Sequence, residues 1–295
     1  MKYAVAIDIG GTNTRVALVN ENLEITDRQQ FSTNPENPGE TLGKIADVIR
    51  NYGDKVVGVG MSCPGPLDLI NGQILTPPNL RGDWQHLHVA QELSDRIGLP
   101  VYLNNDGNLA ALAEAVIGEG KDYRFVQFLT VSTGIGAGFV IDKNIYQGAH
   151  GWANEVENTI MKQGGPCHGS ILPGGIEGIS SGTAITTRAR KAGLDVKHAG
   201  EVNDLAKAGN ETAQEIMTDA KVHLANFIAA IYNLTDPDIV ILGGSVAIKV
   251  EGFVQELVKS KVYEAQREFI KVRKSTLSED SGLLGAAYLA FSKEK

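Results

Sequence analysis

Cysteines, long apolar runs and basic clusters are all scarce in this chain of 295 residues. Its two cysteines, Cys63 and Cys167, lie far apart, so we expect no disulfide framework and a reducing, cytoplasmic location. No run approaches the roughly 18 apolar residues that a membrane-spanning helix needs, and no apolar leader precedes the first strand, so we expect no membrane anchor or signal peptide. The net charge of −8, without a dense basic cluster, argues against a nucleic-acid partner.

Apolar residues make up 42% of the chain, which is enough for two domains with separate cores. The hydrophobic patterns alternate between strands and amphipathic helices, which is typical of an α/β fold. We place a domain boundary between a predicted helix at Leu109–Ile117 and a strand that begins at Phe125. The predicted domains are therefore residues 1–117 and 118–281, and the polar, glycine-rich stretch 118–122 is a plausible hinge.

The stretch from Tyr3 to Val19 has the pattern of a strand, a tight turn and a second strand. Asp8 ends the first strand and is followed by a small polar turn made of Gly10, Gly11, Thr12 and Asn13. Glycines let backbone N–H groups approach a ligand, and such a nest beside a hydroxyl favours phosphate oxygens. Asp8 would repel phosphate, so its plausible partner is a divalent cation that accompanies the phosphates. An ordinary β-turn is the alternative reading of this hairpin alone.

A second stretch, from Phe125 to Ile141, repeats this design around a turn that contains Thr133 and Gly134. Aligning the two hairpins pairs Gly11 with Gly134 and Val16 with Phe139. The repeat predicts a duplicated α/β unit with two phosphate-facing turns that look at each other.

Asp106 follows a short predicted strand at Val101–Leu103 and lies close to the start of the next helix. A helix N-terminus stabilises the ionised form of a carboxyl group. The sequence leaves two roles open for Asp106, a reactive carboxylate or a simple helix cap. Glu155 and Glu177 are equally open, since each could be an ordinary surface acid.

Five motifs resemble those of the ROK sugar kinases, the bacterial glucokinase-like group of the actin/hexokinase ATPase superfamily. The resemblance extends from Tyr3 to about Ala290. It implies two ribonuclease H-like domains with a cleft between them and a C-terminal helix, residues 282–293, that packs back on the first domain. The motifs are DIGGTNTR (Asp8 to Arg15), NNDGN (Asn104 to Asn108), STGIGAG (Ser132 to Gly138), GWANE (Gly151 to Glu155) and DIVILGG (Asp238 to Gly244).

The resemblance implies ATP and Mg²⁺ as cofactors and a sugar as substrate. Asp106 matches the general base that removes the proton of the sugar hydroxyl, and Asp8 matches the residue that orders Mg²⁺ directly or through water. The phosphates would lie on the residues from Gly10 to Asn13 and on Thr133 and Gly134, with adenosine against Gly243 and Gly244. The positions that match sugar contacts are Gly65, Asn79, Asn105, Glu155, Asn158 and Glu177.

The chain departs from the family where most relatives bind a structural zinc through one His and three Cys. Asn158 stands in place of that His and Gly175 in place of the last Cys, while Cys167 survives beside His168. One Cys and one His cannot supply the four ligands of a closed zinc site. We therefore expect no structural zinc, with the loop held by Pro166, Pro173 and local packing. Asn158 keeps a donor and an acceptor, so a contact with a sugar hydroxyl stays possible.

The sequence is thus interpreted as a cytoplasmic, ATP-dependent kinase of a hexose, glucose or a close relative, acting on the 6-hydroxyl. N-acetylmannosamine, fructose and β-glucosides are the alternative substrates. A catalytically idle sugar-binding regulator is the alternative of another class, and the eroded zinc loop is the reason to consider it. A homodimer is expected from the family resemblance alone.

Overall fold

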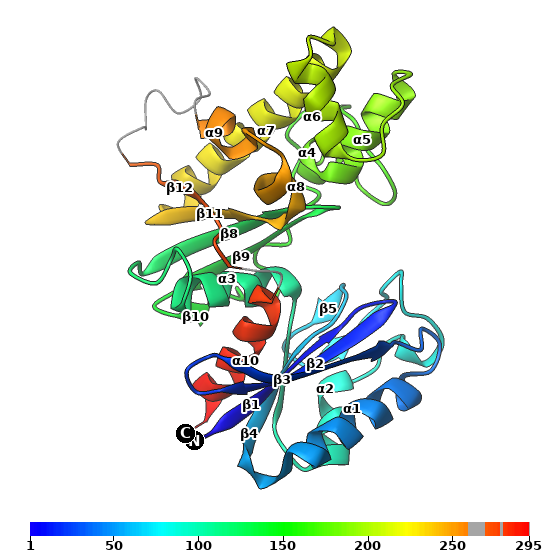
Figure 1. Ribbon diagram of the computed structural model, residues 1–295, viewed down its shortest axis with the longest axis vertical. Coiled ribbons are helices and arrows are strands. Elements are labelled where there is room, and N and C mark those ends of the chain that lie inside the picture. The colour runs from blue at the N-terminus through cyan, green and yellow to red at the C-terminus, as the bar shows by residue number, and fades with distance from the viewer. Residues whose placement is uncertain (259–268, 278–279, 295) are drawn as a thin grey trace. The chain divides into compact units, whose positions relative to one another are not determined.

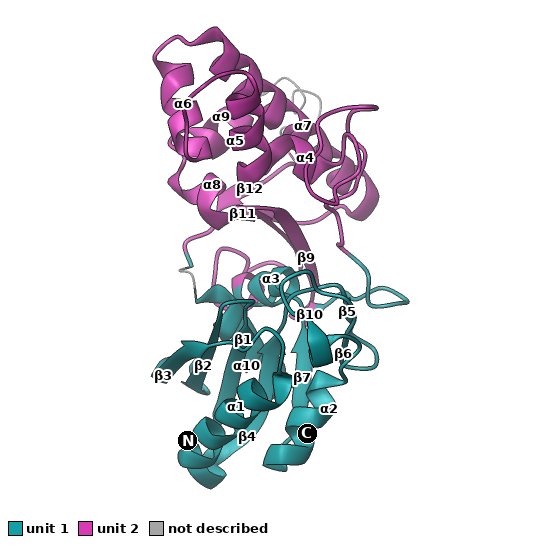
Figure 2. Ribbon diagram, turned by 90° about the vertical axis from the view of Figure 1, so that its right-hand side faces the viewer, with its two compact units in different colours: residues 1–113, 145–153, 277–295 teal, residues 114–144, 154–276 magenta. Residues whose placement is uncertain are grey.

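The structure is a computed structural model that describes residues 1–258, 269–277 and 280–294 (Figure 1). The chain divides into two compact units (Figure 2). The first comprises residues 1–113, 145–153 and 277–295, and the second residues 114–144 and 154–276. The first segment of the first unit thus ends at Ala113 rather than at the predicted residue 117, and this unit includes 145–153, which were predicted to lie in the second domain. Gly151 of this segment packs against Leu69 and Ile70 of the first unit, a contact between distant residues.

The sheet of the first unit has the strand order β3-β2-β1-β4-β7. Strands β1 and β2 form an antiparallel hairpin, and β4 and β7 continue the sheet in parallel. The carboxyl ends of the three parallel strands therefore meet at one edge. The bounds are β1 Tyr3–Ile9, β2 Asn13–Asn20, β3 Ile25–Ser32, β4 Val56–Ser62 and β7 Val101–Asn104, with a separate pair β5 Leu67–Asp68 and β6 Gln73–Ile74.

The two faces of this sheet differ in side-chain size, as alternation along β1 shows. Val5, Ile7 and Ile9 join one core cluster with the apolar faces of α1 and α2. The opposite face carries the small residues Ala4 and Ala6, and α10 packs closely on β1 and β4 there (Figure 1). The bounds are α1 Pro38–Tyr52, η1 Gly53–Lys55, η2 Gly82–Trp84, α2 Val89–Ile97, α3 Asp106–Val116 and α10 Ser281–Lys293.

The second unit repeats the same topology with the strand order β10-β9-β8-β11-β12. Its β8 and β9 form the antiparallel hairpin, and β11 and β12 follow in parallel. The duplication predicted from the two aligned hairpins is therefore present in the strand order of both sheets. The bounds are β8 Phe125–Val131, β9 Ile135–Ile141, β10 Asn144–Ile145, β11 Ile239–Gly243 and β12 Val272–Lys274.

Helix α7 contributes a large part of the hydrophobic core of the second unit. Its predicted apolar face, from Ile216 to Ile231, is buried against the sheet and the neighbouring helices. A helix that the sequence predicts to begin at Asn203 instead begins at Ala199, because the His198 side chain accepts from the N–H of Glu201 and caps the helix. The bounds are α4 Ile176–Ser180, α5 Gly182–Lys191, α6 Ala199–Lys207, α7 Glu211–Thr235, α8 Gly244–Lys249 and α9 Phe253–Val258.

A helix was predicted from Glu251 to Glu268, with Val262 inward. Only α9 falls within the described residues, and 259–268, with Val262, lie outside them. The last strand, β12, is shorter than the predicted Ile270 to Ser275. No helix in the described part of the chain is long and apolar enough to cross a membrane.

The stretch 118–122, predicted as a hinge, is held by hydrogen bonds within the second unit. The Lys143 ammonium donates to the carbonyls of Gly120, Lys121 and Tyr123 at 3.3, 2.7 and 3.0 Å. The buried Glu114 carboxylate accepts from the Glu119 N–H at 3.1 Å. The stretch is therefore an anchored turn, and its role as a hinge stays a prediction.

Candidate functional site

Asp8 lies at the end of β1, directly opposite Arg15 on β2. Arg15 donates to Oδ2 of Asp8 from Nε at 3.1 Å and from Nη2 at 2.6 Å. The other oxygen, Oδ1, accepts no hydrogen bond from any described residue, and 27% of the side chain is exposed. The carboxylate can therefore bind a cation or an ordered water through Oδ1. Arg15 ends the DIGGTNTR motif but was not predicted as a site residue, because only the hairpin register reveals its pairing with Asp8.

The turn after β1 is closed by a hydrogen bond from the Gly10 N–H to the Asn13 carbonyl, at 2.9 Å. This N–H is therefore used within the turn and is not offered to a ligand. A Cβ atom on Gly11 would lie 2.7 Å from the Cβ of Asn79, so only glycine lets the Asn79 loop approach this closely. Thr12 and Asn13 are exposed. The fold thus brings Asn79 onto the predicted phosphate turn.

Asn105, rather than Asp106, caps helix α3. Its Oδ1 accepts from the Asn108 N–H at 2.7 Å, and Asp106 is the first helical residue. Asp106 accepts from the Gly107 N–H at 2.8 Å and its side chain is exposed to solvent. The capping alternative that the sequence left open for Asp106 is therefore wrong, and its carboxylate is not required as a cap.

The pKa of Asp106 is raised above its ordinary value. The density of protein around the carboxylate reduces its solvation even though the side chain still meets solvent, and this is the largest cause. The Gly107 N–H opposes the shift, and the negative charge of Asp8 adds to it. Asp8 and Asp106 are thus close enough to interact. Burial, and then the charge of Asp8, also raises the pKa of the Cys63 thiol, which keeps that thiol protonated.

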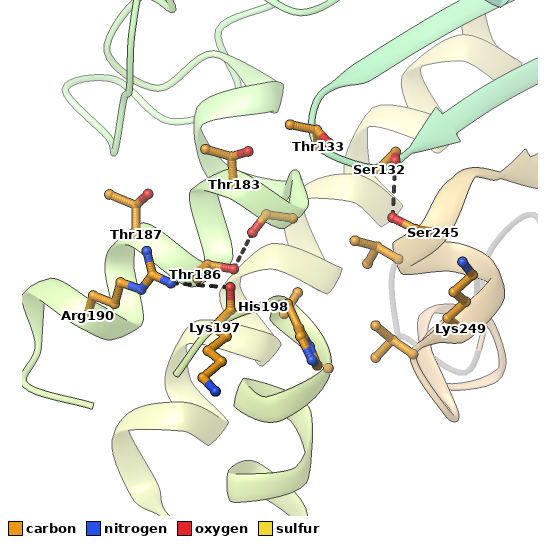
Figure 3. Close-up of a pocket in the computed structure, with 15 residues that line it drawn as sticks. Ser132, Thr133, Thr183, Thr186, Thr187, Arg190, Lys197, His198, Ser245 and Lys249 are labelled. Atoms are coloured by element: carbon orange, nitrogen blue, oxygen red, sulfur yellow. Dashed lines mark hydrogen bonds between the residues drawn. The ribbon is translucent and has the colours of Figure 1, made fainter. Parts of the chain in front are cut away.

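In the second unit, the turn after β8 packs against the starts of two helices. The Gly182 N–H donates to the Ser132 carbonyl at 2.7 Å, and the Thr183 N–H to the Thr133 carbonyl at 3.3 Å. The hydroxyls of Ser132 and Ser245 lie 3.1 Å apart (Figure 3). The turn therefore meets α5 and α8 at one point, immediately beside Gly243 and Gly244.

A pocket of about 490 Å³ opens next to this turn (Figure 3). Of the residues predicted to contact the nucleotide in this unit, only Thr133 lines the pocket. Gly134, Gly243 and Gly244 do not line it but lie next to lining residues in the sequence. Hydroxyl groups and basic side chains from α5, α8 and the start of α6 make up much of the rest. The lining residues are Ser132, Thr133, Gly182, Thr183, Thr186, Thr187, Arg190, Lys197, His198, Ala199, Gly200, Ser245, Val246, Lys249 and Val250.

These basic and hydroxyl residues were not predicted as site residues. The run SGTAITTRAR, from Ser181 to Arg190, is rich in hydroxyl groups and could have been a signal. The chemistry of the pocket suits a polar, anionic ligand, because Arg190, Lys197 and Lys249 are cationic.

Glu177, in α4, bonds directly to the second turn. Its Oε2 accepts from the Ile135 N–H at 2.9 Å, and its Oε1 lies 3.9 Å from Nε2 of His168. The same His168 nitrogen lies 3.3 Å from the hydroxyl of Ser181, which caps α5. His168, predicted only as a remnant of the zinc motif, thus lies between Glu177 and the residue that caps α5.

The remaining predicted sugar contacts differ in their surroundings. Asn158 accepts from the Leu172 N–H at 2.8 Å and donates to Glu157 at 3.3 Å, so its amide closes a loop. Glu155 is exposed at the start of that loop. Gly65 is exposed in the loop after β4, where its bond to Pro66 is cis.

No group of three or more His, Cys, Asp or Glu in residues 1–258, 269–277 and 280–294 is placed to hold a metal ion. The absence of a structural zinc stays a prediction. A zinc-selective chelator is expected to leave the melting temperature unchanged and, with excess Mg²⁺ present, the activity as well. Metal analysis of the purified protein is the control, and one equivalent of zinc that resists dialysis would contradict the prediction.

The chain matches the family model described as "ROK family" over residues 4–293. It is 32% identical to an N-acetylmannosamine kinase of Yersinia pestis (strain Pestoides F) over 296 residues, which is 98% of this chain and 99% of that protein. It is 31% identical to a glucokinase of Thermotoga maritima over 303 residues, which is 96% of this chain and 95% of that protein.

The chain is also similar to solved structures of ROK family sugar kinases. A ROK hexokinase from Thermus thermophilus matches with a TM-score of 0.88 at 30% identity, over 98% of this chain and 99% of that one. A ROK family glucokinase from Streptomyces griseus, in complex with glucose and AMPPNP, matches with a TM-score of 0.76 at 25% identity, also over 98% and 99%. The predicted α/β fold of the actin/hexokinase ATPase type is confirmed.

Proposed function

Since the chain belongs to the ROK family and is an ATP-dependent sugar kinase, we propose that it phosphorylates the 6-hydroxyl of glucose or a closely related hexose. The observation that carries the proposal is Asp106, a solvent-accessible carboxylate at the start of α3 that is not needed as a cap. It interacts with Asp8, which lies beside the first phosphate turn. A base, a candidate metal ligand and a phosphate turn thus occur together in one unit.

Asp106 acts as the general base. It accepts the proton of the sugar hydroxyl as that oxygen forms a bond to the γ-phosphorus, and the bond from the γ-phosphorus to the departing ADP oxygen breaks. The transferring phosphoryl group needs little covalent help, so positioning and charge neutralisation supply most of the catalysis. A raised pKa makes Asp106 a better proton acceptor than an ordinary carboxylate, provided that it is ionised.

The nucleotide occupies the pocket of the second unit, with its phosphates near Thr133 and Gly134. In the first unit, the residues from Gly11 to Asn13 are suited to contact phosphate oxygens. The three cationic side chains of the pocket favour a polyanion. Oδ1 of Asp8 is suited to hold Mg²⁺ directly or through water, since hard cations prefer carboxylate and water oxygens. When bound, this ion would neutralise charge on the phosphates.

The residues proposed to bind the sugar are Glu155 and Glu177 in the second unit, and Asn79, Asn105 and the backbone at Gly65 in the first unit. Each carboxylate can accept hydrogen bonds from sugar hydroxyls, and such charge-assisted bonds contribute about 1.5–3 kcal/mol each. Asn158 contributes by closing the loop, because its amide oxygen and nitrogen are both bonded within it.

N-acetylmannosamine is the second candidate substrate, because a kinase of that sugar is 32% identical over nearly the whole chain. ADP release with Mg-ATP should be measured across glucose, N-acetylmannosamine, fructose and a β-glucoside. The highest kcat/KM is expected for glucose or a close relative. A clear preference for N-acetylmannosamine would replace the hexose assignment, and sugar binding without turnover would instead indicate the idle regulator.

Lys197 should contribute to nucleotide binding through its charge. It is exposed, lines the pocket and lies beside Arg190 and His198 (Figure 3). Lys197→Met is expected to raise the KM for ATP about threefold, since an exposed charge pair contributes about 0.2–1 kcal/mol. The KM for the sugar should not change, and added salt should reduce the difference. Lys191→Met, an exposed lysine outside the lining, is the matched control, and equal KM values for both variants would contradict the prediction.

The activity should fall at low pH as Asp106 becomes protonated. Its raised pKa places this loss above pH 3.8, the ordinary value for an aspartate. A pH profile of kcat/KM with saturating ATP should therefore show an acidic limb above that value, with full activity on its alkaline side. An acidic limb at or below 3.8 would show that the essential base is not Asp106 in this environment.

A further inference from the structure

The loop that leads to Glu177 folds back on itself as a narrow ladder. The Glu177 N–H donates to the Glu157 carbonyl at 3.2 Å, and the Ile176 N–H to the Thr159 carbonyl at 2.9 Å. Further along, the Met161 N–H donates to the Gly174 carbonyl at 2.8 Å. These backbone hydrogen bonds join residues 157–162 to residues 174–177, so the position of Glu177 depends on what holds residues 157–162.

Lys162 attaches the ladder to the rest of the unit. A Cβ atom on Gly174 would lie 1.8 Å from the Lys162 carbonyl oxygen, so the two backbone segments are in direct contact and leave no room for a side chain at position 174. The Lys162 ammonium extends to Asp219 on α7, and its Nζ lies 3.0 Å from Oδ1. This ion pair connects residues 57 positions apart.

Asp219 is the centre of a charge cluster that also includes Arg188 and His223. Arg188 Nη2 donates to Oδ2 of Asp219 at 2.6 Å, and His223 Nδ1 lies 3.3 Å from Oδ1. Arg188, Asp219 and His223 are only 15–20% exposed. Partial burial alone would raise the pKa of Asp219, but the neighbouring Lys162, Arg188 and His223 outweigh it and lower the pKa. The carboxylate is therefore a stable anion.

The same cluster is attached to the far end of α4. Arg188 Nη1 donates to the Ile179 carbonyl at 3.0 Å. The Ser180 hydroxyl donates to the carbonyl of Ala220, the neighbour of Asp219, at 2.8 Å. The segment that carries Glu177 is thus fixed on both sides, through Lys162 before it and through Ile179 and Ser180 after it.

We propose that Asp219 is a positioning residue for sugar binding, because its ion pairs with Lys162 and Arg188 fix the segment that presents Glu177. The ion-pair cluster anchors this loop in addition to the prolines expected from the sequence, of which Pro166 accepts from the Gly174 N–H at 3.0 Å. The inference rests on the proposed role of Glu177 as a sugar contact.

The test compares Asp219→Asn with Glu215→Gln. Both remove one negative charge from α7 and preserve side-chain size, but Glu215 is exposed, lies one turn earlier and forms no ion pair or hydrogen bond with the described residues of the loop. Asp219→Asn is expected to weaken sugar binding about tenfold, measured by calorimetry and as KM, while AMPPNP binding and kcat at saturating sugar stay within about twofold. Glu215→Gln should behave as the wild type.

Lys162→Met provides a second variant, because Lys162 is 47% exposed and its loss removes only the contact on the loop side. It should weaken sugar binding several-fold, and the double variant with Asp219→Asn should be no weaker than Asp219→Asn alone. Unchanged sugar affinity in Lys162→Met, or equal losses of sugar and AMPPNP affinity in Asp219→Asn, would overturn the proposal. Because calorimetry reads binding, a wild type that binds sugar but does not turn over would refute the kinase assignment without affecting this comparison.

Discussion

Asp106→Asn is expected to lower kcat by roughly 10³-fold, within the range of 10² to 10⁴ that a general base contributes. Asparagine has nearly the same shape and can keep the hydrogen bond from the Gly107 N–H, but it cannot accept the proton of the sugar hydroxyl. Helix α3 should be unaffected, since Asn105 supplies its cap. The affinities for sugar and AMPPNP should therefore change little, and the loss should lie in kcat.

Although Asp106→Asn should lose activity, it should be at least as stable as the wild type. A carboxyl group whose pKa is raised by folding binds more protons in the native state, so its ionisation destabilises the fold as pH rises through that range. Asp106→Asn should thus melt at or above the wild-type temperature at pH 7. Asp122→Asn, an exposed carboxylate outside the site, is the control.

For activity, a loss in kcat of less than tenfold in Asp106→Asn would show that Asp106 is not the base.

Gly285→Ala is expected to destabilise the first unit by about 3 kcal/mol or more, the upper range for overpacking. A Cβ atom there would lie 1.9 Å from the Leu109 carbonyl oxygen and 2.6 Å from its carbon. Both are backbone atoms and cannot rotate away, so α10 or α3 would have to shift. Thermal unfolding should occur roughly 10 °C lower, at 2–4 °C per kcal/mol for a protein of this size.

Gly282→Ala is the matched control for this prediction. Gly282 lies in the same helix, but a Cβ atom there would meet nothing within 4 Å. Alanine is about 1 kcal/mol more favourable than glycine in a helix, so this variant should be as stable as the wild type or slightly more stable. If Gly285→Ala and Gly282→Ala have the same melting temperature, Gly285 of α10 does not pack against Leu109 of α3.

The sequence predicted well those elements whose signals are local. The spacing of Leu42, Ile45 and Ile49 in the sequence is that of one apolar helix face and predicts α1, and the hairpin pattern around Asp8 identified β1 and β2. Such periodicity comes from burying one face, which every residue of the element shares. The duplication was visible for the same reason, since both turns kept their glycines.

Long-range pairings could not be predicted in the same way. The Lys162–Asp219 ion pair crosses 57 positions, and nothing near Lys162 in the sequence marks its partner. The pocket lining from α5 and α8 also depends on tertiary packing. The two roles left open for Asp106 could not be separated from the sequence, because either Asn105 or Asp106 could have capped the helix until its start was known.

Identification of the product tests the central claim most directly. Uniformly ¹³C-labelled glucose should be incubated with Mg-ATP and the protein, and the product examined by ³¹P and ¹³C NMR. The account predicts ADP and one sugar phosphate, with phosphorus coupled to carbon 6, and no product with Asp106→Asn on the same time scale. Phosphate on another carbon, or turnover that survives in the variant, would contradict the account.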